Sequence, residues 1–393
     1  MTTIRDVVVV SYARTAFTRA KKGMFKDTRP DTLGAIAIKA AMERAPGVKP
    51  SDIEDVIFGC AMPEGEQGMN VARVSAMLAG LPVEVPAVTV NRFCSSGVQT
   101  ISQAAERIAI GAIDFAVAGG TESMTMVPMG GNKVSANPDV METMPEVYTP
   151  MGVTAENVAA KYGVSREDQD AFALASHKKA VMAWETGFMA GEVIDAEVDV
   201  INEVGHVTRA HAKKDDGPRP DTSAEGLGKL RPAFNPKGTV TAGNASPLTD
   251  GAAALVLTTA DKAAELGLPV MGYYRGFQVA GVAPELMGIG PVPAIRKLLA
   301  KHNLTIADID LFEINEAFAA QAVYCQRELG IPDEKLNIHG GAIALGHPLG
   351  VSGARLAGTL LRSLEKTGGR YGVVSMCIGG GMGAAALFER VAK

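Results

Sequence analysis

The chain has 393 residues, of which 47% are hydrophobic, and carries a formal net charge of −5 at pH 7. This length favours two or three domains of roughly 100 to 200 residues each. Basic residues are spread through both halves, which argues against a nucleic-acid surface, and no apolar run approaches the roughly 20 residues that a membrane span needs. Because no targeting signal is recognisable at either end, we expect a cytoplasmic protein.

The first part of the chain alternates predicted helices and strands. Apolar residues recur three and four apart over 33–44, which predicts a helix. An acidic turn then leads into an apolar strand at 56–59, and 112–119 has the composition of a further strand. This alternation is typical of an α/β fold.

Cys94 lies between the strand-like run 88–90 and a helical pattern that begins near Ser95. The partial positive charge at a helix N-terminus favours thiolate over thiol, so this position predicts a cysteine pKa below the ordinary value of about 8.5. We therefore expect Cys94 to be a nucleophile.

Residues 121–250 do not continue this pattern. They include a helical stretch at 164–185 and a turn-rich run at 215–220, and we interpret them as an inserted loop domain that covers the site. Methionines gather near its start and either line a tunnel for an acyl chain or fill a core, two alternatives that the sequence leaves open. These methionines are Met124, Met126, Met129, Met141, Met144 and Met151.

The last third of the chain repeats the first. Corresponding segments are 33–44 and 292–302, 49–59 and 304–313, and 112–119 and 370–377. A duplicated unit of roughly 120 residues predicts two related α/β halves whose sheets are covered by helices on both sides. We expect an N-terminal half over 1–269, which includes the insertion 121–250, and a C-terminal half over 270–393.

His347 lies in the glycine-rich loop 340–350, before a helical pattern that begins near Ser352. In the repeat this loop corresponds to the one that carries Cys94, so a pseudo-twofold arrangement would bring the imidazole to the thiol that it activates. Asn315 ends the repeated strand, where α/β folds place their ligands. Its amide caps the following helix, or holds a water or a thioester carbonyl, and these roles can coexist.

Cys377 follows the strand-like run 373–376 and opens the glycine-rich turn 378–383. A dinucleotide loop would need a following helix and another strand, whereas 384–388 is a final strand, so a nicotinamide site is excluded. The backbone amides of this turn suit an oxyanion hole. Cys60 and Cys325 have the neighbours of core residues, and the wide spacing of the four cysteines argues against a zinc site or a disulfide scaffold.

Together these motifs resemble the thiolase family over nearly the whole chain. The matching blocks are 91–97, 119–124, 241–246, 315–318, 340–350 and 377–383. The resemblance implies an α/β thiolase fold, with duplicated βαβαβαββ halves in a five-layered α-β-α-β-α sandwich. It also implies coenzyme A thioesters as substrates, a homodimer or homotetramer, and no cofactor or metal.

The resemblance assigns roles to the candidate residues. Cys94 resembles the nucleophile that carries the acyl group, and His347 the base that activates it. Cys377 resembles the acid and base that exchanges a proton with the α-carbon of acetyl-CoA. Asn315, through a water, would stabilise the enolate together with His347, and the backbone amides of Cys94 and Gly379 would bind the oxyanion.

The insertion carries the expected substrate contacts. Arg219 and Ser246 match family positions that contact the nucleotide and pantetheine parts of coenzyme A, and we expect Met151 and Phe318 to line the substrate site. Pro150 and Ser95 depart from short-chain biosynthetic members and resemble the degradative branch of the family, which cleaves longer 3-ketoacyl-CoA in β-oxidation.

The sequence supports other functions less well, and some of them less than others. Synthesis of acetoacetyl-CoA is the main alternative because thiolase chemistry is reversible. Condensing enzymes that use acyl carrier protein are disfavoured, since they place a histidine at the position of Asn315 and lack Cys377. A non-catalytic scaffold that binds coenzyme A or lipid is the remote alternative, and a partner from a β-oxidation complex is compatible with the sequence.

Overall fold

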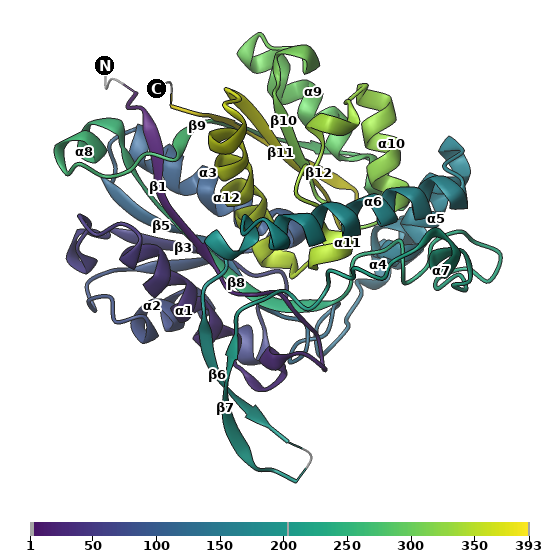
Figure 1. The fold of residues 1–393 in the computed structure, drawn as a ribbon, viewed down its shortest axis with the longest axis horizontal. Coiled ribbons are helices and arrows are strands. Elements are labelled where there is room, and N and C mark those ends of the chain that lie inside the picture. The colour runs from purple at the N-terminus through teal and green to yellow at the C-terminus, as the bar shows by residue number, and fades with distance from the viewer. Residues whose placement is uncertain (1–3, 203, 392–393) are drawn as a thin grey trace.

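The computed structural model describes residues 4–202 and 204–391, and its centre is a large mixed sheet (Figure 1). The strands follow the order β10-β11-β12-β9-β1-β8-β5-β3-β4, and β2 pairs with β8. Their bounds are β1 Val7–Arg14, β2 Thr18–Arg19, β3 Asp55–Gly59, β4 Ala87–Val90, β5 Phe115–Ser123, β8 Thr249–Thr259, β9 Gly272–Gly281, β10 Leu311–Ile314, β11 Tyr371–Ile378 and β12 Met382–Glu389.

The strand order shows the predicted duplication. From β1 outward the sheet runs β8, β5, β3, and from β9 outward it runs β12, β11, β10. In both halves the two outer strands of these series are parallel, as β3–β5 and β10–β11, and the next pair is antiparallel, as β5–β8 and β11–β12. The halves meet where β1 pairs with β9. The prediction of two related α/β halves is therefore confirmed.

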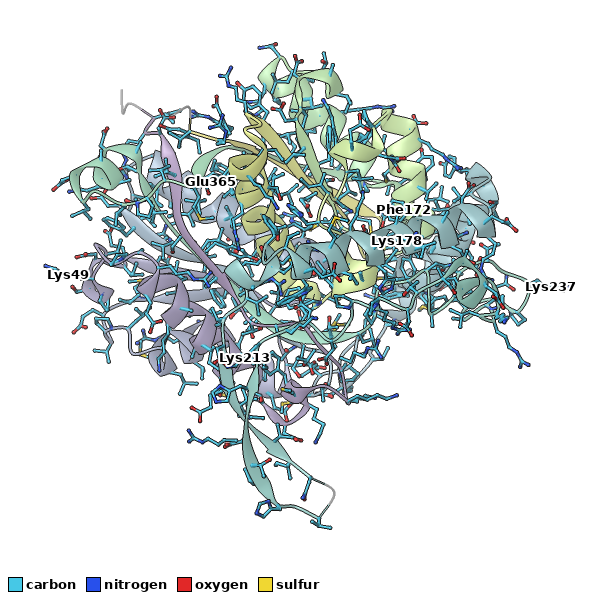
Figure 2. All side chains as sticks on the ribbon, viewed as in Figure 1. Lys49, Phe172, Lys178, Lys213, Lys237 and Glu365 are labelled. Atoms are coloured by element: carbon cyan, nitrogen blue, oxygen red, sulfur yellow. The ribbon has the colours of Figure 1, made fainter. Side chains whose placement is uncertain are left out.

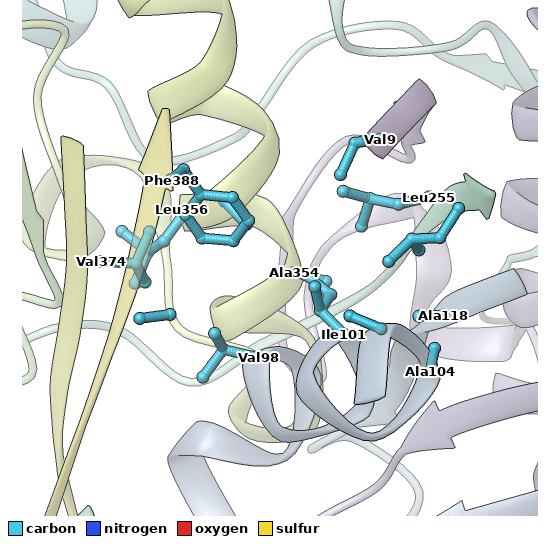
Figure 3. Close-up of a cluster of buried hydrophobic side chains, with 14 of the residues drawn as sticks. Val9, Val98, Ile101, Ala104, Ala118, Leu255, Ala354, Leu356, Val374 and Phe388 are labelled. Carbon is cyan, nitrogen blue, oxygen red and sulfur yellow. The ribbon is translucent and has the colours of Figure 1, made fainter. Parts of the chain in front are cut away.

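Helices form the remaining layers. One hydrophobic cluster packs α1 and α2 against the strands of the first half, and another packs α9 and α10 against those of the second. Helices α3 and α12 lie between the halves, where their apolar residues meet strands from both (Figure 3). The predicted five layers are thus present, with these helices: α1 Pro30–Glu43, α2 Val71–Leu78, α3 Ser96–Ala109, α9 Pro291–His302, α10 Ala319–Leu329 and α12 Leu349–Thr367.

The two central helices cross at a pair of glycines. A Cβ atom on Gly97 would lie 2.6 Å from the backbone nitrogen of Ala354, and one on Gly353 would lie 2.4 Å from that of Val98. Only residues without side chains allow the helix backbones to approach this closely. Because Cys94 and His347 stand just before these helices, the crossing brings their loops together.

The chain between β5 and β8 wraps around the outside of the sandwich. It contains the hairpin β6–β7, which projects from the body in Figure 1, and four helices. The bounds are α4 Pro138–Thr143, α5 Met151–Tyr162, α6 Arg166–Glu185, β6 Ala196–Ile201, β7 Val207–Ala212 and α7 Ala224–Gly228, and outside the insertion α8 spans Ala260–Glu265 and α11 Ala342–Leu345. The exact domain boundaries stay a prediction.

The methionines of the insertion do not form one tunnel or one core. Met124 is buried beside Cys94, whereas Met129, Met141 and Met144 are 44%, 48% and 52% exposed. The core interpretation is wrong for these three, because the segment that carries them lies on the surface, whereas the tunnel stays a prediction.

Charged side chains cover the outer surface, as the lysines at the periphery of Figure 2 illustrate. Among residues 4–202 and 204–391, no helix is long and apolar enough to cross a membrane. The same residues contain no group of three or more His, Cys, Asp or Glu side chains placed to hold a metal ion.

Candidate active site

Cys94 lies in a short 3-10 turn, Phe93–Ser95, directly before α3. Phe93 has a φ of 43°, a left-handed conformation that costs a non-glycine residue about 1–3 kcal/mol. The turn is held by the Asn91 side chain, which accepts the Phe93 N–H at 2.8 Å, and by the Ser96 hydroxyl, which donates to the Phe93 carbonyl at 2.7 Å. This strained turn fixes the position of the thiol.

The pKa of Cys94 contradicts the prediction from the sequence. The side chain is only 1% exposed, and burial raises the pKa of its thiol to about 12. Hydrogen bonds from the backbone N–H groups of Gly379 and Cys94 itself act in the opposite direction but are weaker. The prediction rested on the helix N-terminus alone, whereas α12 and the insertion bury the thiol. Cys94 is therefore a neutral thiol that needs a base.

His347 lies between α11 and α12, and its two ring nitrogens have different partners. Nδ1 is 2.5 Å from the Ser352 hydroxyl, which donates its own proton to the Pro348 carbonyl at 3.0 Å. Since that hydroxyl has one proton, Nδ1 must be the donor and Nε2 must carry the lone pair. Burial, and then the charge of Arg355, lowers the pKa of His347 to about 3, so the ring is neutral. Nε2 is thus prepared to accept a proton.

Asn315 extends from the end of β10, and its Nδ2 lies 3.2 Å from Nε2 of His347. Helix α10 begins at Ala319 with Phe318 as its N-cap, so the interpretation of Asn315 as a helix cap is wrong. Its Oδ1 is buried without a hydrogen-bond partner among residues 4–202 and 204–391. Nδ2 of Asn315 is therefore a hydrogen-bond donor, and Nε2 of His347 an acceptor, at one place in the site.

Cys377 lies near the end of β11 and is fully buried. Burial raises its pKa well above the ordinary value, and a charge on Cys94 would raise it further, so the two sulfurs lie within electrostatic reach of each other. It shares a hydrophobic cluster with Met151 and Phe318. The structure thus brings both thiols and both predicted apolar contacts to one place.

Gly379 opens the turn between β11 and β12. A Cβ atom here would lie 3.7 Å from Cδ2 of Phe93 and 4.0 Å from Sδ of Met151. The turn continues through Gly380 and Gly381 with φ values of 80° and 82°, which glycine adopts without strain. This backbone path aims the Gly379 N–H at the Cys94 sulfur.

Arg219 lies in a separate cavity of about 220 Å³ that also includes Arg19, His177 and Pro247. Burial, and then the charges of Arg219 and Arg19, lowers the pKa of His177 to about 4. Ser246 adjoins this cavity in sequence, and its N–H donates to the Ala317 carbonyl at 3.0 Å, beside the Asn315 loop. The cavity is therefore a basic pocket, and Ser246 links it to the chain segment that carries Asn315.

Two further residues of the site were not predicted. Ser352 orients His347, and the repeat could have found it, because Ser96 and Gly97 after Cys94 match Ser352 and Gly353 after His347. Glu122 lies in the matching block 119–124, but no role was predicted for it. Its buried carboxylate binds the loops of both halves by accepting from Ala61 N at 2.7 Å, Gly350 N at 2.7 Å, Gln67 Nε2 at 2.7 Å and Met62 N at 3.3 Å.

Comparisons with known proteins agree with the geometry. The chain matches the thiolase N-terminal domain over residues 7–261 and the thiolase C-terminal domain over 268–390. It is similar to 3-ketoacyl-CoA thiolase of Bacillus subtilis, with 52% identity over 98% of this chain and 100% of the relative. It is also similar to peroxisomal 3-ketoacyl-CoA thiolase B of mouse, with 49% identity over 98% of this chain and 91% of the relative.

A solved structure, the acetyl-CoA acetyltransferase of Bacillus anthracis, matches with a TM-score of 0.90 and 38% identity over 100% of both chains. Its likeness extends to the whole sandwich, including the insertion. On these grounds the chain is a member of the thiolase family.

Proposed function

We propose that the protein is a 3-ketoacyl-CoA thiolase, an acyltransferase that cleaves 3-ketoacyl-CoA with coenzyme A in fatty acid β-oxidation. The observation that carries the proposal is the pair of buried thiols, Cys94 and Cys377, beside a neutral imidazole with its lone pair on Nε2. Relatives named 3-ketoacyl-CoA thiolase cover nearly the whole chain and support it. Coenzyme A and acyl-CoA enter as substrates.

In the first half-reaction, Nε2 of His347 takes the proton of Cys94 as the sulfur attacks the 3-keto carbon. The N–H groups of Cys94 and Gly379, which point at that sulfur, would stabilise the oxyanion that forms next to it. The bond between the α- and 3-carbons then breaks, and its electrons form the enolate of acetyl-CoA. Cys377 gives its proton to the α-carbon, which leaves an acyl group on Cys94 and a thiolate on Cys377.

In the second half-reaction, the Cys377 thiolate takes the proton of the incoming coenzyme A thiol. The coenzyme A sulfur attacks the acyl group on Cys94, and the Cys94 sulfur leaves and regains its proton from His347. Both thiols are then restored. Asn315 contributes a donor beside His347, where the thioester oxygen of the enolate carries negative charge.

The cavity around Arg219 is the proposed site of the nucleotide part of coenzyme A. Arg19, His177 and Arg219 supply positive or donor groups for phosphate, and Ser246 lies on the way to the thiols. Met151 and Phe318 form the apolar wall near Cys377. An Arg219→Ala variant should raise the KM for coenzyme A while kcat changes little, because these contacts are far from the bonds that break.

The acyl chain length decides between the proposed function and acetoacetyl-CoA synthesis, the activity suggested by the name of the Bacillus anthracis structure. We expect higher kcat/KM for thiolysis of 3-ketodecanoyl-CoA than of acetoacetyl-CoA. Steady-state rates with both substrates test this. A preference of about tenfold or more for acetoacetyl-CoA, equivalent to about 1.4 kcal/mol, would favour the short-chain function.

The edge strand β4 supports the proposed homodimer or homotetramer. It ends the sheet, and Val88 on it and Val83 before it are 42% and 72% exposed. An unpaired apolar edge is a template for pairing with a second chain. Light scattering of wild type and a Val88→Lys variant tests this. Location in the cytoplasm and a β-oxidation partner stay predictions from the sequence, since the relatives include a bacterial protein and peroxisomal ones.

A further inference from the structure

Gln321 is a fully buried polar residue in the first turn of α10, and the proposed mechanism does not use it. Its Oε1 accepts a hydrogen bond from Sγ of Cys377 at 3.7 Å. Its Nε2 is buried and completes no hydrogen bond within residues 4–202 and 204–391, although a contact from the Gln321 side chain acts to lower the pKa of the Cys325 thiol, which burial raises to about 12. Leaving such a donor unpaired costs about 1–3 kcal/mol, so this amide group needs an explanation.

The stem of Gln321 is fixed by its neighbours. A Cβ atom on Gly288 would lie 2.9 Å from Cβ and 3.2 Å from Cγ of Gln321, so the backbone of residue 288 packs directly on that stem. The neighbouring Cys325 uses its thiol proton elsewhere, because Sγ donates to the Gly288 carbonyl at 3.4 Å. The remaining freedom of Gln321 is rotation of its terminal amide, which exchanges the positions of Oε1 and Nε2.

Cys377 needs opposite partners in the two states that the mechanism requires. As a thiol it donates, and the Oε1 of Gln321 is its acceptor. As a thiolate it can only accept, in an apolar cluster with Met151 and Phe318 where burial opposes the charge. The other thiols that act on its charge, Cys94 and Cys325, raise this cost further. The Cys377 thiolate therefore needs a hydrogen-bond donor beside it.

We propose that Gln321 is a positioning residue that serves both states of Cys377 by turning its amide, an inference that rests on the proposed thiolase function. While Cys377 carries its proton, Oε1 faces the sulfur. When that proton moves to the α-carbon of the acetyl-CoA enolate, a half-turn of the amide places the unpaired Nε2–H against the thiolate. The amide returns when Cys377 takes the proton of the coenzyme A thiol.

Proton exchange at acetyl-CoA measures the proton transfers of Cys377. In D2O, Cys377 removes a proton from the methyl group of acetyl-CoA and returns a deuteron, which mass spectrometry detects. A Gln321→Leu variant keeps the volume but loses both polar atoms. We expect its exchange rate to fall by about tenfold or more, the scale of general acid and base catalysis, while alkylation of Cys94 by iodoacetamide, a reaction without a role for Cys377, stays within about twofold of the wild-type rate.

A Gln321→Glu variant separates the donor from the acceptor. A protonated carboxyl can still donate and accept, but a carboxylate can only accept, so the exchange rate of this variant should fall as the pH rises while that of wild type does not. If Gln321→Leu does not fold, this pH profile still tests the proposal. Gln326→Leu is the matched control, since Gln326 lies on the same helix but its amide donates to the Ile331 carbonyl at 3.2 Å, and this variant should exchange at the wild-type rate.

Several results would overturn the inference. Exchange by Gln321→Leu at the wild-type rate would show that Cys377 needs no partner. An equal loss of exchange and of Cys94 alkylation would make Gln321 a structural residue only. If wild type itself neither exchanges deuterium nor becomes acetylated, the thiolase proposal fails, and that result is distinguishable because it precedes any variant.

Discussion

The Ser352 hydroxyl and Nδ1 of His347 lie 2.5 Å apart, and this contact determines which nitrogen of the imidazole is free. Since Ser352 donates to the Pro348 carbonyl, Nδ1 keeps the ring proton and Nε2 faces the site. Ser352, which does not touch the substrate, therefore prepares His347 to act as the base that the reaction needs. Such a contact is a positioning interaction, and its loss should affect catalysis more than folding.

Replacing Ser352 by alanine should lower kcat by about tenfold or more, because the ring can then rotate or place its proton on Nε2. Steady-state thiolysis measures this. Ser363→Ala is the matched control, since Ser363 is buried in the same helix and its hydroxyl donates to the carbonyl of Thr359 at 2.8 Å. Equal losses in both variants would assign the effect to helix α12 and contradict the positioning role.

Replacing Gly97 by alanine should destabilise the fold by about 1–3 kcal/mol, because its Cβ would lie 2.6 Å from the Ala354 nitrogen, where backbone has to move. Urea unfolding followed by circular dichroism measures the free energy of unfolding. Gly228→Ala is the control, since a Cβ there meets no atom within 4 Å. Wild-type stability of Gly97→Ala would show that the helix crossing is not as tight as described.

The sequence predicted the repeat and the alternation of helices and strands, because each depends on local patterns that occur twice. It also predicted a site shared by Cys94, His347, Asn315 and Cys377, of which the structure places Asn315 beside His347 and Cys94 within electrostatic reach of Cys377. It did not predict the high pKa of Cys94, because burial depends on segments far away in the chain. Glu122 and Gln321 were missed for a related reason. Each acts through partners that only the folded chain brings near, so the matching block 119–124 around Glu122 gave no sign of its role.

Replacing Glu122 by glutamine should destabilise the protein by about 2–3 kcal/mol. The carboxylate accepts from the Ala61, Met62 and Gly350 N–H groups and from the Gln67 side chain, and an amide NH2 turned toward these donors cannot accept. Urea unfolding checks this against Glu225→Gln, a change at an exposed carboxylate on α7. No difference between the two variants would contradict the proposed link between the loops.

His347 should make stability depend on pH. Its pKa falls to about 3 in the folded protein, whereas an unfolded histidine titrates near 6.5. The unfolded chain therefore binds the extra proton first, so the stability from His347 is complete above about pH 6.5 and is lost as the pH falls toward 3. At pH 5 the loss is about 2 kcal/mol.

Urea unfolding at pH 7 and pH 5 tests this pH dependence. His347→Gln should lose less stability than wild type between these two pH values, and the exposed His206→Gln should behave as wild type. An unchanged pH dependence in His347→Gln would mean that folding does not lower the pKa of His347, and it would contradict the buried, neutral imidazole described for the site.

The measurement that tests the central claim most directly is mass spectrometry of the protein after mixing with 3-ketodecanoyl-CoA in the absence of coenzyme A. The two-thiol account predicts release of acetyl-CoA and an octanoyl group, two carbons shorter than the substrate's acyl chain, on Cys94. Cys94→Ala should show neither. An adduct on another residue, or acetyl-CoA release by Cys94→Ala, would contradict the account.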